Sequence, residues 1–418
     1  MSNHCQNAIK SMLRELSSLT IYRGVLERPA VANLLEILRA CVRDDENTVC
    51  DCWGKLCCHL IVEGKMRSLP AAVSSDLLQD ENQFVIRIAG GDLNSSDPII
   101  NLAQRDLDIL YRASKNAADI ILKNIDESLS GCLPRWSNDP AEFPLNRAWD
   151  DCIDELKDYH RRHGVGRFAV NTAFLWHESC MRPVIYPDPV RLSDLKSYEV
   201  QRKIAVDNTL AFLDGYEANN MLLYGDRGTG KSSTVKALLN EYAGRGLRMI
   251  EMPKEQLSGL PDLTEQLAPL PMKFIIFIDD LSFSGGDDNF AALKAVLEGG
   301  LASRPKNVLI YATSNRRHLL RETFSDRSGD EIHRADTVQE SVSLSDRFGI
   351  FLTFLLPDKQ HFLEIVEQMA ADRGLDVDRQ TLLNAAEKWA LERGARSPRF
   401  AKQFIADAQA RLSRGEFL

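Results

Sequence analysis

The chain has 418 residues, of which 44% are hydrophobic and 27% are charged, and its formal net charge is −9. This length corresponds to two or three domains, and this composition is ordinary for a globular protein, which excludes intrinsic disorder as its main state. No stretch approaches the roughly 18 consecutive apolar residues of a membrane span, and residues 1–19 lack the apolar core of a signal peptide. We therefore expect a cytoplasmic protein with no membrane partner. The acidic net charge does not favour binding to nucleic acid, although a local basic groove stays compatible with it.

The first 182 residues predict a mostly α-helical N-terminal domain. Apolar residues recur there at helical spacing, and short polar or glycine- and proline-containing breaks separate the segments. Two such apolar sets are Leu34, Leu35, Ile37, Leu38 and Cys41, and Leu102, Leu107, Leu110, Ala113 and Ala117.

A cysteine cluster in this domain raises the question of a metal site. It consists of Cys50, Cys52, Cys57, Cys58 and His59. The cluster lacks the paired C-x-x-C spacing of structural zinc sites. We favour buried, unmetallated thiols, with Cys50 and Cys57 on one face of a helix, because free cysteine behaves as a small core residue.

A domain boundary is expected at Arg182–Pro189, where three prolines favour an extended connector. Beyond it, short apolar runs alternate with helical stretches, which predicts a parallel five-stranded sheet in an α/β domain over residues 183–356. Residues 357–418 read as a C-terminal helical domain with breaks at Gly374 and Gly394. The expected strands are Met221–Tyr224, Leu247–Met252, Phe274–Ile278, Val308–Thr313 and Ile350–Phe354.

A complete phosphate-binding motif, G-x-x-x-x-G-K-[ST], follows the first of these strands. Its glycines let backbone N–H groups approach phosphate oxygens, and the following helix adds the partial positive charge of its N-terminus. Lys231 is expected to reach the β- and γ-phosphates, and the Ser232 hydroxyl to ligate Mg²⁺. The motif therefore predicts an ATP and Mg²⁺ site at Gly225, Asp226, Arg227, Gly228, Thr229, Gly230, Lys231, Ser232 and Ser233.

Two aspartates end the third expected strand, where such a site needs acidic groups. Asp279 is placed to hold the magnesium ion, and Asp280 to orient or deprotonate the attacking water. A glutamate would reach about 1.5 Å further than Asp280, so slow hydrolysis is compatible with this motif. Asn315, which follows the fourth strand, can hydrogen-bond the γ-phosphate or the water.

Together these motifs resemble those of the AAA+ P-loop ATPases. The initiator and helicase-loader branch of AAA+ proteins has two aspartates at the position of Asp279 and Asp280. The resemblance implies that Asn315 is the sensor-1 residue and that Arg347, in Ser343–Gly349, is an arginine finger acting on a neighbouring subunit. It also implies a sensor-2 arginine at the start of the last helix, with Arg399 preferred to Arg396, and an adenine-covering segment that includes Tyr198.

The amino-acid sequence around these motifs resembles that of a bacterial family of predicted AAA+ ATPases, which is catalogued as a domain of unknown function. The resemblance is carried by Asn219–Tyr242, Val296–Pro305 and Tyr311–His318. It is clear from Pro183 to Leu412, and it continues more weakly through Asp80–Phe84 and Tyr159–Gly164.

The resemblance implies a homo-oligomer, commonly a hexamer, with ATP sites between subunits. Partner choice would then belong to residues 1–182, and the polar insertion Arg316–Ser341 would form a surface loop. Three functions remain open. They are an ATPase that remodels or assembles a protein partner, a nucleic-acid-linked ATPase suggested by Asp279–Asp280 and Arg316–Arg317, and a slow ATP-dependent switch or scaffold.

Overall fold

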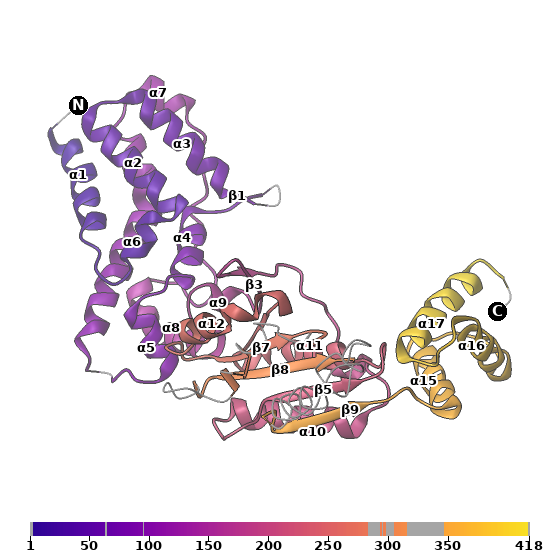
Figure 1. Ribbon diagram of the computed structural model, residues 1–418. Helices are drawn as coiled ribbons and strands as arrows, with labels where there is room; N and C mark the ends of the chain where they lie inside the picture. Colours follow the sequence, from indigo (N-terminus) through magenta and orange to yellow (C-terminus); the bar gives the residue numbers. More distant parts are fainter. Residues whose placement is uncertain are drawn as a thin grey trace. The chain divides into compact units, whose positions relative to one another are not determined.

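The computed structural model describes residues 3–62, 65–94, 96–282, 293–294, 296–297, 305–315 and 347–416 (Figure 1). The chain divides into two compact units: residues 1–170 with 270–272, and residues 171–269 with 273–418. Among the described residues, no helix is both long and apolar enough to cross a membrane.

The first unit is mostly helical, as the sequence predicts. Its helices start at well-defined caps: Ser68, Asn82 and Asp97 each accept a hydrogen bond from a backbone N–H of the helix that follows. The elements are α1 (Asn3–Ser17), η1 (Arg23–Glu27), α2 (Pro29–Arg43), α3 (Glu46–Leu60), β1 (Ile61–Val62), β2 (Lys65–Met66), α4 (Leu69–Leu78), α5 (Gln83–Gly90), α6 (Pro98–Leu122), α7 (Glu127–Cys132), η2 (Trp149–Cys152), α8 (Ile153–His163) and α9 (Arg167–Val170).

The two apolar sets predicted for this unit are confirmed in all but one position. The five residues from Leu34 to Cys41 are buried on α2, and Leu107, Leu110, Ala113 and Ala117 are buried on α6. Leu102 is 43% exposed, because the buried face of α6 passes through Ile100 and Ala103 instead.

The expected pairing of two cysteines on one buried face of α3 is wrong. Cys57 is buried, but Cys50 is exposed, and Cys52 takes the buried position in the same part of the helix. The face of α3 that packs inward follows Val49, Cys52 and Leu56, at the spacing of three and four residues that a helix requires.

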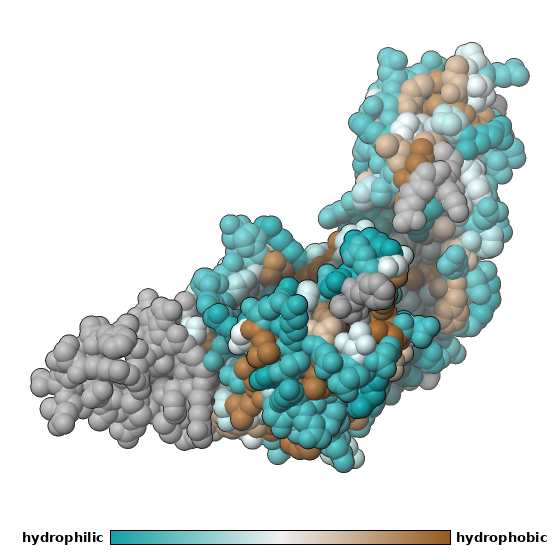
Figure 2. Space-filling model, turned by 90° about the vertical axis from the view of Figure 1, so that its right-hand side faces the viewer, coloured by the Kyte–Doolittle hydropathy of each residue, from teal (hydrophilic) through white to brown (hydrophobic). Residues whose placement is uncertain are grey.

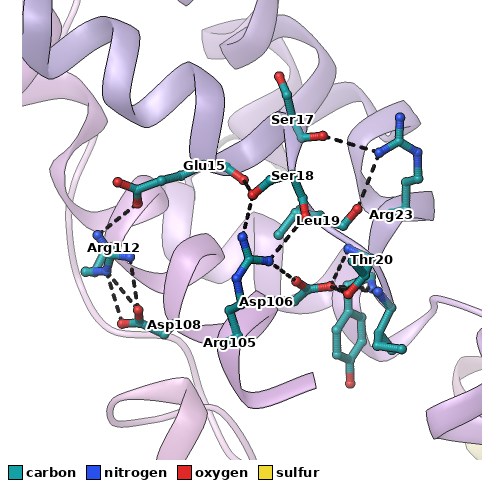
Figure 3. A network of polar contacts seen from close by, with 12 residues as sticks. Glu15, Ser17, Ser18, Leu19, Thr20, Arg23, Arg105, Asp106, Asp108 and Arg112 are labelled. Carbon is teal, nitrogen blue, oxygen red and sulfur yellow. Dashed lines mark hydrogen bonds and ion pairs between the residues drawn. The ribbon is translucent and has the colours of Figure 1, made fainter. Parts of the chain in front are cut away.

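A buried carboxylate joins α1 to α6 in this unit (Figure 3). Asp106, on α6, is fully buried and accepts hydrogen bonds from the backbone N–H groups of Thr20 (2.8 Å) and Ile21 (2.7 Å) and from Arg105. These bonds satisfy backbone donors in the turn after α1 and give the buried Asp106 carboxylate its partners. The contact therefore has a structural role.

The second unit holds the α/β domain. Among the described residues, seven strands form its sheet in the order β4-β3-β6-β7-β8-β5-β9. All neighbours are parallel except β3 and β4. The strands are β3 (Ala173–His177), β4 (Cys180–Pro183), β5 (Met221–Gly225), β6 (Leu247–Glu251), β7 (Lys273–Ile278), β8 (Val308–Ser314) and β9 (Ile350–Phe354), and the helical segments between them are η3 (Leu192–Asp194), α10 (Glu199–Leu213), α11 (Lys231–Tyr242), η4 (Ala243–Arg245), η5 (Lys254–Gly259) and α12 (Leu260–Leu267).

The five expected strands are all present, but the expectation of a five-stranded sheet is wrong. The β3–β4 hairpin adds two strands, because β3 pairs in parallel with β6 from Ala173 to Leu175. This hairpin precedes the proline-rich connector, so the sheet-bearing unit begins at residue 171 rather than at residue 183. The run Ala173–His177 is apolar but only five residues long, and the four-residue run Cys180–Pro183 contains an arginine and a proline, so tertiary pairing decides their conformation.

The parallel strands β5, β7 and β8 bring their carboxyl ends to one edge of the sheet. The strand β8 lies between β5 and β7, so residues that follow all three strands meet there. One face of this sheet is buried against α10 and α11, which fixes the strand that precedes the phosphate-binding loop and the helix that follows it. That core includes Ala205, Phe212, Met221, Leu223, Val235, Leu238, Ile275, Phe277, Tyr311, Leu352 and Phe354.

A helical lid ends the chain and consists of α15 (Lys359–Asp372), α16 (Arg379–Arg393) and α17 (Pro398–Ser413). The predicted breaks are confirmed: Gly374 and Gly394 both have positive φ angles, at the ends of α15 and α16. The lid has its own apolar core, which includes Phe362, Val366, Ala386, Phe404 and Ile405.

Figure 2 shows that hydrophilic residues cover most of the described surface on the viewed side, with smaller hydrophobic areas among them.

Candidate active site

The phosphate-binding loop connects β5 to α11, in the strand–loop–helix arrangement that the motif requires. Gly225 has φ +135°, and a Cβ there would lie 2.1 Å from the carbonyl oxygen of Phe354, so only glycine fits. Gly228 and Gly230 also have positive φ angles. Because Gly230 caps α11 without a side chain, the first N–H groups of this helix remain available to an anion. Arg227 is exposed on the loop, and the Thr229 hydroxyl donates to the Asp226 carbonyl at 2.8 Å.

Lys231 is the first residue of α11 and is 6% exposed. Its ammonium group donates to the carbonyl oxygens of Gly225 (2.9 Å) and Asp226 (2.6 Å) and to Asn315 Oδ1 (3.1 Å). Burial lowers the pKa of Lys231, while nearby carboxylates act in the opposite direction. The side chain is thus folded back along the loop, within reach of phosphate groups bound there.

Ser232 and Asp279 come together although they are 47 residues apart in the chain. The Ser232 hydroxyl donates to Asp279 Oδ1 at 2.6 Å. One hydroxyl and one carboxylate, both oxygen donors, are the protein ligands that Mg²⁺ commonly takes beside phosphates. The residues present therefore fit a magnesium ion, as the sequence predicts.

Asp280 follows Asp279 in the left-handed region with φ +52°, which among non-glycine residues aspartate and asparagine adopt most readily. Its backbone N–H donates to the Thr313 hydroxyl at 3.0 Å, and its carboxylate accepts a hydrogen bond from Asn315 Nδ2 at 2.6 Å. Asn315 lies directly after β8, so it contacts Lys231 through its oxygen and Asp280 through its nitrogen. The structure thus brings together Lys231, Asp280 and Asn315.

Thr313 is a residue of this site that the sequence analysis missed. Its hydroxyl donates to Asp279 Oδ1 at 2.5 Å and accepts the hydrogen bond from the N–H of Asp280. Thr313 lies two residues before Asn315 on β8, and alternate residues of a strand share a face. That period-two relationship is the signal by which the sequence could have identified it.

The two candidate lid arginines have different surroundings. The backbone N–H of Arg399 donates to the Gly228 carbonyl of the phosphate-binding loop at 3.1 Å. A Cβ at Gly228 would lie 3.2 Å from the Cβ of Arg399. Arg396 instead forms an ion pair with Glu387 of the lid at 2.6 Å. The structure therefore places Arg399 beside the loop and engages Arg396 within the lid.

Tyr198 lies near the other end of the loop. Its ring packs on Phe354, with centroids 4.9 Å apart, and its hydroxyl donates to the Leu355 carbonyl at 2.5 Å. Burial, together with the charge of Asp226, raises the pKa of Tyr198 to about 12. The Asp226 carboxylate accepts a hydrogen bond from the Leu356 N–H at 2.8 Å. The loop and Tyr198 thus hold the segment that leads into the lid.

Arg347 lies away from these residues within its own chain. Arg347 lies before the first residue of β9, Ile350, which pairs with Met221 at the start of β5. The phosphate-binding loop begins at the opposite end of β9, where Gly225 pairs with the last residue, Phe354. At about 3.3 Å per residue, β9 alone spans about 13 Å between these ends. The structure therefore does not bring Arg347 to the loop of the same chain. The insertion Arg316–Ser341, with Arg316–Arg317, lies outside the described residues.

The fold has the arrangement expected of an AAA+ P-loop protein, with a mostly parallel sheet, a phosphate-binding loop after β5 and three C-terminal helices. Residues 169–412, more than half of the chain, match the family described as "Protein of unknown function (DUF815)". The chain belongs to this family. The match of the DUF815 family begins before Pro183 and so includes the β3–β4 hairpin, whereas Asp80–Phe84 and Tyr159–Gly164 lie outside it.

Among solved structures, the DUF815 chain is similar to RuvB of Thermotoga maritima. A structure titled as the RuvB Holliday junction branch migration motor has 17% sequence identity and a TM-score of 0.37, with 54% of this chain and 66% of that chain covered. A single-residue RuvB variant also has 17% identity, with a TM-score of 0.38 and coverage of 55% and 67%. No curated protein sequence matches the DUF815 chain significantly.

Proposed function

We propose that this chain is an ATPase that binds Mg-ATP and hydrolyses it to remodel or assemble a macromolecular partner. The observation that carries the proposal is the convergence of Lys231, Ser232, Asp279, Asp280 and Asn315 at the carboxyl ends of β5, β7 and β8. Phosphate-binding groups, magnesium ligands and a carboxylate placed for water activation are the parts that phosphoryl transfer to water requires.

Each group has a distinct role in this proposal. The loop N–H groups and Lys231 hold the phosphates, and Ser232 and Asp279 hold the magnesium ion. The ion, when bound, neutralises negative charge on the phosphate oxygens. Asp280 accepts a proton from the attacking water, and Asn315 orients both the water and the Asp280 carboxylate. Arg399 contacts the nucleotide from the lid, and Tyr198 lies beside the adenine.

The proposal includes self-assembly, because Arg347 is far from the phosphate-binding loop of its own chain. A neighbouring subunit would supply Arg347 to each ATP site, so that an active site is complete only between two subunits. The oligomer would be a ring, commonly of six subunits. The helical N-terminal unit, residues 1–170 with 270–272, would then select a protein partner. The rest of residues 171–356 would act as the ATPase core, and residues 357–418 as the lid.

The test is calorimetric titration of the full chain with ATP in the presence and absence of Mg²⁺, followed by measurement of phosphate release. Saturable binding that Mg²⁺ strengthens, together with steady release of phosphate, is expected. Absence of saturable binding would overturn the proposal. Binding without phosphate release would instead favour the slow switch, and release that DNA stimulates and salt suppresses would favour the nucleic-acid-linked ATPase.

A further inference from the structure

We infer that Thr313 is a positioning residue for hydrolysis, which couples the magnesium ligand Asp279 to the backbone of Asp280. The inference rests on the proposed ATPase function and deepens it. Thr313 is 2% exposed and stands on β8, between the strand that precedes the phosphate-binding loop and the strand that ends in the two aspartates.

The direction of the hydrogen bonds around Thr313 is fixed by its partners. The backbone N–H of Asp280 can only donate, so the Thr313 oxygen accepts at 3.0 Å. The hydroxyl hydrogen is therefore free to point at Asp279 Oδ1, 2.5 Å away, and that carboxylate oxygen accepts it. A hydroxyl is needed here because a methyl group can do neither.

The bond from the Thr313 hydroxyl constrains Asp279. Its Oδ1 atom accepts from Thr313 on one side and from Ser232 on the other. When the Ser232 oxygen turns toward a metal ion, the Thr313 bond still fixes the orientation of the carboxylate. Hydrogen bonds to a metal-ligating carboxylate typically change metal affinity or activity about 10- to 100-fold when they are removed.

The bond from the backbone N–H of Asp280 to the Thr313 oxygen constrains Asp280. The left-handed backbone of Asp280, with φ +52°, aims its carboxylate at Asn315. Such a conformation persists only where the surroundings hold it, and the bond from its N–H to Thr313 is one such restraint. Thr313 thus acts on both aspartates.

Isosteric replacement tests the inference. Thr313→Val removes the hydroxyl and keeps the shape, so we expect kcat to fall about 10- to 100-fold. The affinity for ATP measured by calorimetry should stay within about threefold, because the phosphate-binding loop is untouched. The Mg²⁺ concentration that gives half-maximal hydrolysis should rise. Thr313→Ser, which restores the hydroxyl, should recover most of kcat and the original Mg²⁺ midpoint.

Thr209→Val is the matched control. Thr209 is also a fully buried threonine of this unit, and its hydroxyl bonds to the Ala205 carbonyl at 2.8 Å. We expect this variant to keep the wild-type Mg²⁺ midpoint. If Thr313→Val proves insoluble, Thr313→Ala carries the same expectations.

The two possible failures can be distinguished. If the wild-type chain neither binds nor hydrolyses ATP, the proposed function itself is wrong. If the wild type hydrolyses ATP and Thr313→Val does so with unchanged kcat and Mg²⁺ midpoint, the ATPase stands and the role of Thr313 is wrong. An equal loss in Thr313→Ser and Thr313→Val would also overturn the inference, because the hydroxyl would then not be the group that matters.

Discussion

The side-chain amide of Asn315 donates a hydrogen bond of 2.6 Å to the carboxylate of Asp280. The same amide accepts a hydrogen bond from Lys231 through its oxygen. One residue at the end of β8 therefore contacts both the phosphate-binding lysine and the carboxylate proposed to activate water. Mutation of Lys231 is therefore expected to affect ATP binding, and mutation of Asp280 to affect hydrolysis.

Lys231→Ala is expected to abolish or greatly weaken binding of Mg-ATP while the fold remains intact, because Lys231 is the buried cation whose ammonium group lies against the phosphate-binding loop. Calorimetric titration measures the affinity, and circular dichroism checks the fold. Lys236→Ala, on the same helix α11, is the matched control and should bind normally. Unchanged affinity in Lys231→Ala would remove the nucleotide-site assignment.

Asp280→Asn should preserve ATP binding and nearly stop hydrolysis, because an amide cannot accept the proton of the attacking water. The hydrogen bond to Asn315 can persist through the remaining oxygen, so the geometry is largely kept. Phosphate release under saturating ATP measures the effect. Turnover at the wild-type rate would mean that another group is the base; the acidic pair Asp287–Asp288 is one such candidate and lies outside the described residues.

Arg399→Ala should lower hydrolysis more than Arg396→Ala, because only Arg399 lies against the phosphate-binding loop. Arg396→Ala breaks an ion pair with Glu387 inside the lid. Because Arg396 is partly exposed, solvent screens this ion pair, and we expect only a small loss of stability. The rate of phosphate release measures the loss of hydrolysis in each variant, and the midpoint of thermal unfolding measures the loss of stability. The opposite ranking of rates would assign the sensor role to Arg396.

Arg347 tests assembly together with mechanism. Where it has been dissected, an arginine finger contributes about 10³- to 10⁵-fold in rate. We expect wild-type activity per subunit to rise with protein concentration, and Arg347→Ala to bind ATP but hydrolyse it poorly. A mixture of Arg347→Ala and Asp280→Asn should regain activity, because some interfaces then pair an intact Asp280 with an intact Arg347. If mixing restores nothing and activity per subunit is flat, the assembly of trans-acting sites is wrong.

Asp76, in the helical N-terminal unit, predicts a pH dependence of stability. Burial raises the pKa of Asp76, against the attraction of Arg28, His59 and Arg67. A carboxyl group whose pKa is higher in the folded state favours folding while protonated, and this stabilisation is lost as the pH rises from the unfolded pKa through the folded pKa.

Asp76→Asn should therefore be more stable relative to wild type at pH 7.5 than at pH 4.5. Urea unfolding followed by tryptophan fluorescence measures the difference at each pH. Asp119→Asn, which removes the same charge from an exposed position of α6, controls for the change in net charge. A gain that is equal at both pH values would contradict the prediction.

Local sequence signals predicted much of the core. The five strands and the loop from Gly225 to Ser233 were correctly placed, because continuous apolar runs and a complete motif specify them without tertiary information. The β3–β4 hairpin was missed because its short strands depend on pairing with β6.

Other features depended on contacts between distant residues. The choice between Arg396 and Arg399 could not be made from spacing, since the ion pair with Glu387 forms only when α16 meets the start of α17. The left-handed conformation of Asp280 follows from its surroundings on two strands, and the motif alone does not reveal it.

Among the described residues, hydrogen bonds connect the phosphate-binding loop at two points to the lid and to the segment that leads into it. Near its entry, Asp226 accepts a hydrogen bond from Leu356, and further along, the N–H of Arg399 donates to Gly228. The first point adjoins the covalent connection and can serve as a pivot, so the second acts as a latch. A single hydrogen bond contributes about 0.5–1.5 kcal/mol, which corresponds to a factor of only about 2 to 13 between latched and open lids. Such a latch opens by thermal motion alone, and a ligand in the loop needs only a modest difference in affinity to decide which state prevails.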